Sequence, residues 1–160
     1  MDLSQENRAR GLSYVSRAEV VAARPDRVFA VLEDPALLAD LTPAFLAPRL
    51  VRGPWLMRAG ERIEMEMSYW GFDFEWRLEV VAYARGSEIT HRLVAGPLPF
   101  FEHRQLVQPA GEGETRLVDL ISYRVGYGLA GRLFDRLVLK SDLEHALIHR
   151  NQRLRQLLGV

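Results

Sequence analysis

The sequence contains no cysteine and only one lysine among its 160 residues. The absence of cysteine excludes disulfides, thiolate metal sites and cysteine nucleophiles, and it is compatible with a cytoplasmic protein. Lysine and arginine together number 21, as do aspartate and glutamate, so the formal net charge is zero. Without a basic excess the chain has no electrostatic footprint for a phosphate backbone, and we expect no nucleic-acid partner.

Long apolar runs are also missing. No segment approaches the roughly 20 residues that span a bilayer, and the N-terminal stretch MDLSQENRARGLS is too polar for a signal peptide. We therefore expect a soluble, cytoplasmic protein without integral membrane association. A hydrophobic fraction of 48% in a chain of this length predicts one globular domain over residues 1–160, with residues 1–12 as a flexible or extended N-terminal segment.

The first third of the sequence predicts a strand followed by two short helices. Residues 13–22 carry Tyr14, Val15, Val20 and Val21, as a strand would. Pro25 suits the first turn of a helix, and Asp34 before Pro35 is typical of a capped start of a second helix.

The middle of the sequence alternates apolar and polar residues with a period of two. Short turns separate the segments and no helix intervenes, which indicates an antiparallel sheet. The sets expected on the inner face are Ile63, Met65, Met67 and Tyr69; Phe72, Phe74, Trp76, Leu78 and Val80; Ile89, His91 and Leu93; Phe101, His103, Gln105 and Val107; and Thr115, Leu117, Asp119, Ile121 and Tyr123.

Residues 129–158 contain no proline and predict one long C-terminal helix. Its apolar stripe is expected at Leu133, Leu137, Leu147, Leu154 and Leu158. The fold class is therefore α+β, with a curved antiparallel sheet wrapped around the long helix and two short helices after the first strand.

This order of elements, with certain residues in it, resembles the helix-grip superfamily (SRPBCC, or START-like, proteins) and within it the bacterial polyketide cyclase/dehydrase-like branch. The first helix reads PDRVFAVLEDP, residues 25–35. Further matches are Gly96, Pro97, Phe101, His103, Thr115, Asp119, Tyr123, Gly128, Gly131 and Arg150. The sequence departs from the branch at Leu147 and His149, where aromatic residues are usual, and at Gln105, where a second histidine often stands.

The resemblance implies a cavity between the sheet and the long helix. Members of the superfamily carry lipids, sterols, quinones or polyketides, and some are enzymes, so the resemblance implies no single reaction.

His103, Asp119 and Tyr123 are the candidate catalytic residues. A histidine held by an aspartate can serve as a general base, and a tyrosine hydroxyl can polarise a carbonyl. Alternatively, His103 and Asp119 satisfy each other as a buried pair, and Tyr123 belongs to the core.

The candidate ligand-binding residues share the inner face of the sheet or the predicted helix stripe. They are Met65, Met67, Tyr69, Phe74, Trp76, Phe101, Gln105, Leu133, Leu137 and Lys140. Each apolar member can instead be plain core, and Lys140 can instead pair with Glu144 at the sheet edge. His145 and His149 have a metal-like spacing but no third ligand, so we predict neither metal nor cofactor.

Two functions follow, both using the same cavity. The first is a carrier or binding protein for a small hydrophobic molecule such as a lipid, quinone or polyketide. The second is a polyketide cyclase, aromatase or dehydratase-like enzyme using His103, Asp119 and Tyr123. An interaction module is a third class, favoured by an exposed apolar patch on the outer face of the long helix. A monomer and a homodimer are both compatible with the sequence.

Overall fold

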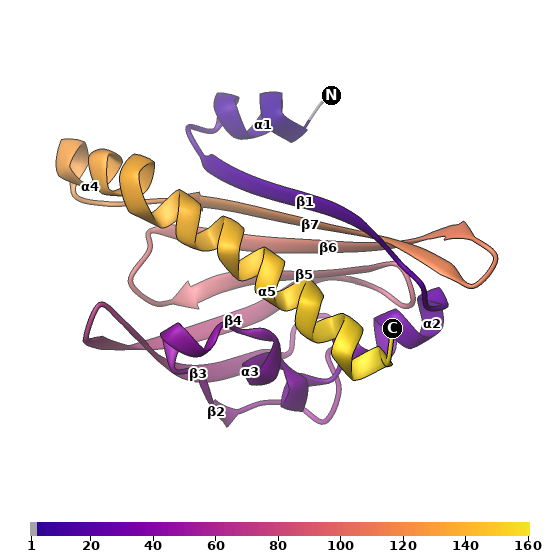
Figure 1. Ribbon diagram of the computed structural model, residues 1–160. Coiled ribbons are helices and arrows are strands. Elements are labelled where there is room, and N and C mark those ends of the chain that lie inside the picture. The colour runs from indigo at the N-terminus through magenta and orange to yellow at the C-terminus, as the bar shows by residue number, and fades with distance from the viewer. Residues whose placement is uncertain (1–2) are drawn as a thin grey trace.

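A computed structural model describes residues 3–160, and its seven strands form one antiparallel sheet in the order β1-β7-β6-β5-β4-β3-β2 (Figure 1). Successive strands from β2 to β7 pair with their neighbours in the chain, and β1 closes the order against β7. The strands are β1 (Ser13–Val21), β2 (Arg49–Arg52), β3 (Arg62–Tyr69), β4 (Phe72–Ala84), β5 (Glu88–Ala95), β6 (Phe100–Gly111) and β7 (Glu114–Arg124).

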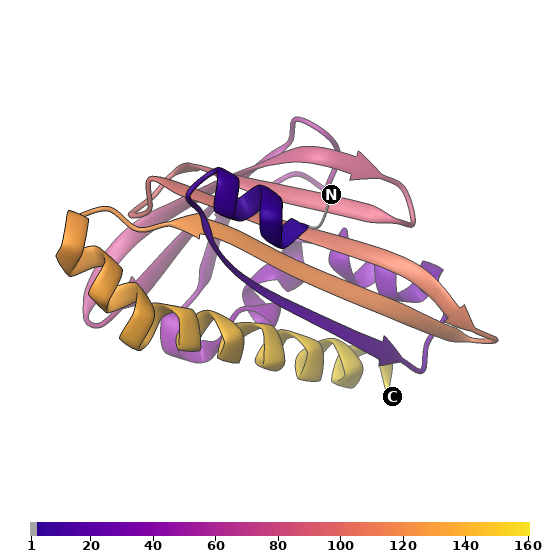
Figure 2. The same ribbon diagram turned by 90° about the horizontal axis from the view of Figure 1, so that it is seen from above.

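The long C-terminal helix crosses the sheet diagonally and lies along one face of it (Figures 1 and 2). It consists of α4 (Gly128–Phe134), a π-helical turn (Asp135–Leu139) and α5 (Lys140–Leu158), without a break. The α+β helix-grip fold expected from the sequence is thus confirmed, with the sheet curved around the helix (Figure 2). Among residues 3–160, no helix is both long and apolar enough to cross a membrane.

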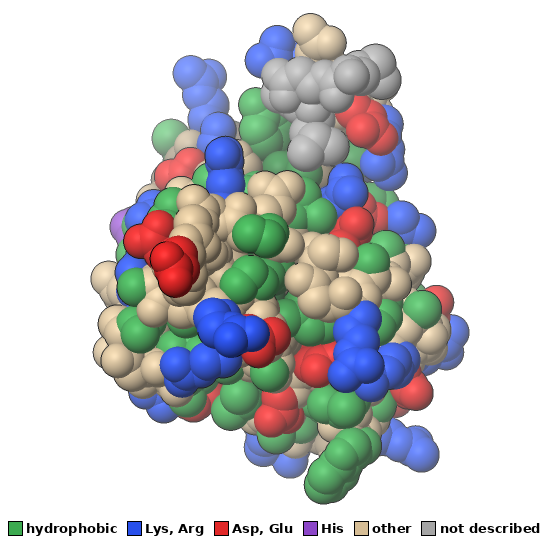
Figure 3. Space-filling view, turned by 90° about the vertical axis from the view of Figure 1, so that its right-hand side faces the viewer, with side chains coloured by type: hydrophobic (Ala, Val, Ile, Leu, Met, Phe, Trp, Pro, Cys, Tyr) green, Lys and Arg blue, Asp and Glu red, His purple; other side chains and the backbone are tan. Residues whose placement is uncertain are grey.

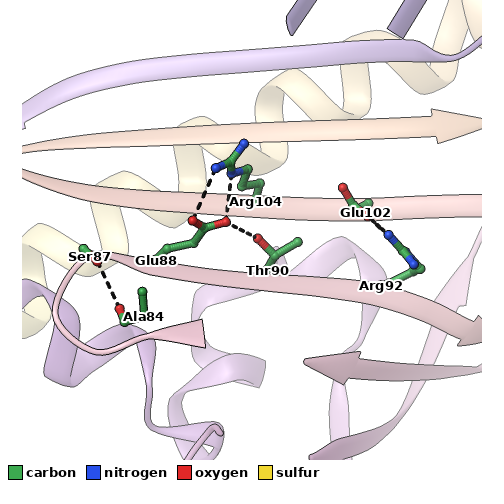
Figure 4. A network of polar contacts seen from close by, with 7 residues as sticks. All are labelled: Ala84, Ser87, Glu88, Thr90, Arg92, Glu102 and Arg104. Atoms are coloured by element: carbon green, nitrogen blue, oxygen red, sulfur yellow. Dashed lines mark hydrogen bonds and ion pairs between the residues drawn. The ribbon is translucent and has the colours of Figure 1, made fainter. Parts of the chain in front are cut away.

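The alternation of the strands gives the sheet one apolar and one charged face. Inward residues of β3 to β7 are mostly buried, whereas charged residues pair across strands on the outer face. Arg92 bonds Glu102, and Arg104 bonds Glu88, which also accepts a hydrogen bond from Thr90 (Figure 4). Such exposed pairs contribute little to stability, about 0–1 kcal/mol each. The charged outer face therefore mainly favours this strand register and keeps that side of the sheet in contact with water.

Two short helical segments cover the side of the sheet next to α5. They are α2 (Pro25–Leu32) and the pair formed by a 3₁₀ turn (Pro35–Leu37) and α3 (Leu38–Leu41). Asp34 caps the second segment through its carboxylate, which accepts a hydrogen bond from the Ala36 amide at 2.9 Å. A further 3₁₀ turn (Ala44–Leu46) leads into β2, the edge strand.

The N-terminal segment differs from the prediction. Residues 3–9 form the helix α1 (Leu3–Ala9) beside β1, rather than an extended segment (Figure 1). Asn7 is buried and its carbonyl accepts a hydrogen bond from the Leu12 amide, which anchors the end of the helix. Residues 1–2 of the predicted segment lie outside the described residues.

One glycine fixes how the long helix leaves the sheet. A Cβ atom at Gly131 would lie 1.7 Å from the backbone oxygen of Gly126, well inside any allowed contact. Only glycine permits this close approach of α4 to the end of β7. Since Gly131 also lines the cavity described below, this contact places the start of the helix at the wall of that cavity.

Candidate functional site

A cavity of about 580 Å³ lies between the concave face of the sheet and the long helix. Its wall is mostly apolar, with side chains from β3, β4 and β6 on one side and from α3, α4 and α5 on the others. Of the residues predicted for the site, the following line it: Met65, Met67, Tyr69, Phe74, Trp76, Phe101, His103 and Gln105. Their position follows from strand alternation, and their role toward a ligand stays a prediction.

Aromatic rings form the sheet side of this cavity. Trp76 meets Phe101 edge to face at 4.8 Å between centroids and Phe74 in the same manner at 6.1 Å. Across to β3, Met65 is opposite Trp76 and Met67 is opposite Phe74. Flexible thioethers beside fixed rings give a wall that is ordered yet adapts to the shape of an apolar guest.

The helix side of the cavity departs from the prediction. Leu133 and Leu137 are 59% and 67% exposed, Lys140 is exposed as well, and none of the three lines the cavity. The predicted placement of these three residues is therefore wrong. The helical wall consists of Ala130, Gly131, Phe134, Leu139, Leu143, Ala146, Leu147 and Arg150.

The π-helical turn is the physical reason for this departure. Inward positions advance by four residues from Ala130 to Phe134, by five across the turn to Leu139, and by four again to Leu143. A π-turn accommodates one additional residue. The residues that precede the turn therefore point to a different side of the helix than regular helical spacing predicts. The sequence prediction continued the regular helical spacing from Leu147 back toward the N-terminus. Without the extra residue of the π-turn, that spacing selects residues that lie on the exposed side of the helix.

His103 and Asp119 lie together at the inner end of the cavity wall. His103 Nε2 is 2.8 Å from Asp119 Oδ1, and Gln105 Nε2 donates to the same oxygen at 3.3 Å. In the β6–β7 register Asp119 is opposite Gln105, so His103 reaches it diagonally. His103 lines the cavity, whereas Asp119 is 0% exposed and does not. The carboxylate therefore acts on the imidazole and the amide, not on a guest directly.

Burial sets the protonation of this pair. It lowers the pKa of His103, with a smaller opposing effect of the bond to Asp119 and an added lowering from Arg150. Burial raises the pKa of Asp119, but His103, Arg150 and Gln105 outweigh it and the net pKa lies below its ordinary value. At neutral pH Asp119 is anionic and His103 is neutral, with its proton on Nε2 and a lone pair on Nδ1.

Arg150 is the functional candidate that the site prediction omitted. It projects from α5, lines the cavity and is only 6% exposed. Its Nε lies 3.6 Å from Asp119 Oδ1, which is an ion pair without a hydrogen bond. Burial lowers the pKa of Arg150, an effect that Asp119 opposes, and the guanidinium remains charged. An arginine between the buried Leu147 and Leu154 was the signal available in the sequence.

Tyr123 does not belong to the cavity. Its ring is fully buried on the inner face of β7, and its hydroxyl donates to Asp135 Oδ1 at 2.5 Å. Ser13 donates to the other oxygen of the same carboxylate at 2.7 Å. Burial and the bond to Asp135 raise the pKa of Tyr123 well above its usual range. The predicted catalytic placement of Tyr123 is thus corrected: its hydroxyl is occupied by Asp135, in the π-helical turn of the long helix.

Tyr69 lines the cavity, but its hydroxyl is also engaged. It donates to Asp142 Oδ2 at 2.5 Å, which joins β3 to α5. Burial and this bond raise the pKa of Tyr69 to about 12. The residue therefore presents its ring to the cavity, and the bond holds the sheet and the helix together beside it.

Large apolar side chains surround the opening of the cavity. Trp70 is 71% exposed and Tyr127 is 88% exposed, and both line the cavity together with Phe45 and Phe72. Trp70 and Gly71 form a two-residue hairpin turn with φ of 52° and 79°. Tyr127 has φ of 68°, so two bulky aromatic residues at the opening occupy the left-handed region that such residues rarely adopt.

His91, predicted to be structural, is buried at the cavity wall beside His103. The two are opposite each other across β5 and β6, and His91 Nε2 lies 3.4 Å from Met57 Sδ. Burial, with contributions from His103 and Arg150, lowers the pKa of His91 to about 3. His145 and His149 find no third partner, since residues 3–160 contain no cluster of three histidine, aspartate or glutamate residues suited to a metal ion.

Comparison with known proteins agrees with this geometry. A sequence model of the family described as "Polyketide cyclase / dehydrase and lipid transport" matches residues 14–159. No curated protein matches the sequence at a significant level.

Several solved structures share the fold. The protein TTHA0849 from Thermus thermophilus has a TM-score of 0.69 at 20% identity, with 89% of this chain and 97% of that chain covered. A START superfamily protein from Mycobacterium smegmatis has a TM-score of 0.68 at 20% identity, with 90% and 98% covered. An aromatase/cyclase from a Streptomyces species has a TM-score of 0.64 at 16% identity, with 91% and 96% covered. At these identities the likeness establishes the fold alone.

Proposed function

The chain belongs to the polyketide cyclase / dehydrase and lipid transport family, and on this premise we propose that it binds one small hydrophobic molecule between the sheet and the long helix, as a carrier or binding protein. The observation that carries the proposal is the cavity of about 580 Å³ with its apolar lining. Pockets for drug-sized ligands commonly measure about 300–1,000 Å³ and combine apolar walls with a few polar groups. This cavity fits that description.

The cavity is also difficult to explain as ordinary core. Protein interiors are close-packed, and voids much larger than a water molecule are few in a domain of this size. An apolar space of this volume costs stability unless something fills it, because the residues around it lose packing contacts. A bound molecule would restore those contacts.

Titration with N-phenyl-1-naphthylamine, a neutral dye that fluoresces in apolar surroundings, tests this proposal. We expect saturable binding of one dye per chain, with competition by long-chain lipids. Fluorescence that rises without saturation, or that resists every lipid competitor, would show that the dye finds only surface patches and that the cavity holds no ligand.

A second candidate function is an enzyme of the dehydratase type, favoured by His103. Its Nδ1 has a lone pair, the residue lines the cavity, and Asp119 holds the opposite ring nitrogen. In a dehydration, Nδ1 would take a proton from the carbon next to a ligand carbonyl and return it to the departing hydroxyl, which leaves as water. Tyr123 has no part in this version.

Replacement of His103 distinguishes the two functions. If the protein is an enzyme, His103→Gln should abolish the conversion of a β-hydroxy carbonyl substrate that the variant still binds. If the variant and the native protein both bind such a compound and neither converts it, the carrier function stands alone.

A further inference from the structure

Several buried polar atoms beside the cavity have no hydrogen-bond partner. They are Gln105 Oε1, Asp119 Oδ2 and Arg150 Nε. Buried polar atoms are nearly always paired, because an unpaired one forfeits its bond to water without replacement. So many of them around one carboxylate indicate that the site is completed by something other than these side chains.

The guanidinium of Arg150 is the strongest of these unsatisfied groups. It has five N–H donors, yet none bonds another described residue, and its charge partner Asp119 is already held by His103 and Gln105. Arg150, His103 and Gln105 all line the cavity. Elsewhere the wall is mostly apolar, and its polar side chains Thr42, Tyr69 and Asp142 are engaged with protein partners. His91 lies opposite His103, so polar recognition is concentrated around Arg150 and the two histidines.

We infer that the ligand has an apolar body and one oxygen-bearing end, a carbonyl or a carboxylate, which accepts hydrogen bonds from Arg150 and lies beside His103. This inference rests on the proposed function and names the class of its ligand. The body would lie along Trp76, Phe101 and the methionines of β3. The terminal oxygen would accept hydrogen bonds from the guanidinium, which offers more than one donor in a fixed plane.

The two oxygen chemistries differ in their proton balance. Asp119 and Arg150 already neutralise each other, so a ketone adds no charge to the site. A carboxylate adds one negative charge, which a proton taken up on Nδ1 of His103 neutralises. The other charged or titratable group that faces His103 is His91, opposite on β5. Carboxylate binding should therefore weaken as pH rises, whereas ketone binding should not.

Displacement of N-phenyl-1-naphthylamine by a matched dodecyl series tests the inference. Dodecanoate and 2-dodecanone represent the two oxygen ends, and dodecylamine provides a cationic end of equal length. We expect at least one oxygen compound to displace the dye at a concentration about 10- to 100-fold lower than the amine. Titration at two pH values then separates the carboxylate from the ketone.

Replacement of the guanidinium provides the variant arm. Arg150→Met keeps the length of the side chain and should erase the preference for oxygen. The double variant Arg150→Met with Asp119→Asn keeps the buried charge balanced in case the single variant folds poorly. Arg153→Met on the outer side of α5, where Arg153 pairs with Asp40, is the matched control.

The outcomes separate the two proposals. If the dye binds and the whole series displaces it equally, or if the preference persists without the guanidinium, the inferred polar end is wrong while the carrier function stands. If neither the dye nor any member of the series binds, both fail.

An independent observation concerns the outer face of the long helix. Leu129, Leu133 and Leu137 are exposed four residues apart, and Arg132, Arg136 and Lys140 are exposed on the adjoining stripe. Asp135 is the only acid within 127–141, and its carboxylate is bonded to Tyr123 and Ser13. On the face seen in Figure 3, by contrast, charges of both signs lie beside one another.

Leucines next to cations match the make-up of helices that lie at a membrane surface. The stripe begins at Leu129, two residues after Tyr127 at the opening of the cavity. We propose that this face docks on an anionic bilayer, with the opening of the cavity toward the lipid. The charge favours a membrane because anionic headgroups attract Lys and Arg near the surface, each cation raising binding about five-fold. The leucines would lie at the boundary of the acyl chains.

Sedimentation with vesicles tests the docking face. We expect binding to phosphatidylcholine vesicles that contain phosphatidylglycerol, with loss at high salt and little binding to pure phosphatidylcholine. Arg132→Glu with Arg136→Glu should reduce binding by more than 10-fold, and Leu133→Glu should reduce it at any salt concentration. Val94→Glu, at an exposed valine of β5, is the control. Binding that the variants do not change, or concentration-dependent dimers that Leu133→Glu abolishes, would overturn the proposal.

Discussion

The hydroxyl of Tyr123 donates a hydrogen bond of 2.5 Å to Asp135, the first residue of the π-helical turn. This bond ties the last strand of the sheet to the point where the long helix changes its inward face. Ser13 on β1 holds the second oxygen of the same carboxylate. The anchor and the turn together decide that Leu139 and Leu143, rather than Leu137 and Lys140, face the cavity.

Removing the Tyr123 hydroxyl should cost stability and leave ligand binding intact. Tyr123→Phe deprives the half-buried Asp135 carboxylate of one partner, and we expect a loss of about 1–3 kcal/mol in the free energy of unfolding, measured by urea denaturation. Dye affinity should not change because the hydroxyl points away from the cavity. Tyr14→Phe, at a hydroxyl that bonds no described residue, is the control. Native stability combined with lost binding would instead place Tyr123 at the ligand.

A methyl group at Gly131 should displace the start of the long helix. The Cβ of Gly131→Ala would lie 1.7 Å from a backbone oxygen, which cannot move away as a side chain would. We expect a loss of about 1–3 kcal/mol or more, together with weaker dye binding, because α4 forms part of the cavity wall. Gly53→Ala, where the nearest atom lies at 3.5 Å, should be nearly neutral. Equal behaviour of the two variants would contradict the close approach.

Stability should fall as the pH drops from about 6.5 to about 3. Burial lowers the pKa of His91 to about 3, while the unfolded chain keeps the ordinary value of about 6.5. In this window the unfolded state binds the additional proton, so stability is complete above the unfolded pKa and is lost toward the folded one. His103, whose pKa is also lowered, acts in the same direction.

Urea denaturation at a series of pH values measures this slope. His91→Leu should flatten it between pH 6 and 4, since leucine does not titrate and fits an apolar wall. A His91→Leu slope identical to that of the native protein would mean that His91 already takes up its proton in the folded state.

Filling the cavity should block binding without harming the fold. Ala146 lines the helical wall, and the ring of Ala146→Phe would occupy part of the empty space. We expect dye affinity to fall at least about 10-fold and the melting temperature to hold or rise, because apolar contacts replace a void. Leu137→Phe adds similar bulk on the exposed side of the same helix. Unchanged affinity in Ala146→Phe would place the ligand elsewhere.

The sheet was predictable from the sequence because its signal is local. Alternation with a period of two assigned Trp76, Phe101 and Asp119 to the inner face, and no distant contact was needed to decide this. The proximity of His103 and Asp119 followed from two adjacent strands with the same inward phase. Alternation does not decide whether His103 and Asp119 contact a ligand or form only a structural hydrogen-bonded pair.

The extent of the long helix was predictable from the sequence, but the residues that face the sheet before the π-turn were not. The π-turn begins at Asp135, whose carboxylate bonds Tyr123 and Ser13, two residues distant in the sequence that come close only after folding. The same lack of tertiary information hid the occupied hydroxyl of Tyr123. Arg150 was overlooked as a site residue because its partner Asp119 lies on another element, so its place between Leu147 and Leu154 did not show by itself that the charge is buried.

The central claim is that the cavity holds one hydrophobic molecule, and native mass spectrometry tests it most directly. The native protein and Ala146→Phe are each incubated with a lipid extract, desalted and measured before and after denaturation. The account predicts one added organic mass per chain on the native protein, lost on unfolding and absent from the filled variant. No added mass on either protein, or the same added mass on both, would contradict it.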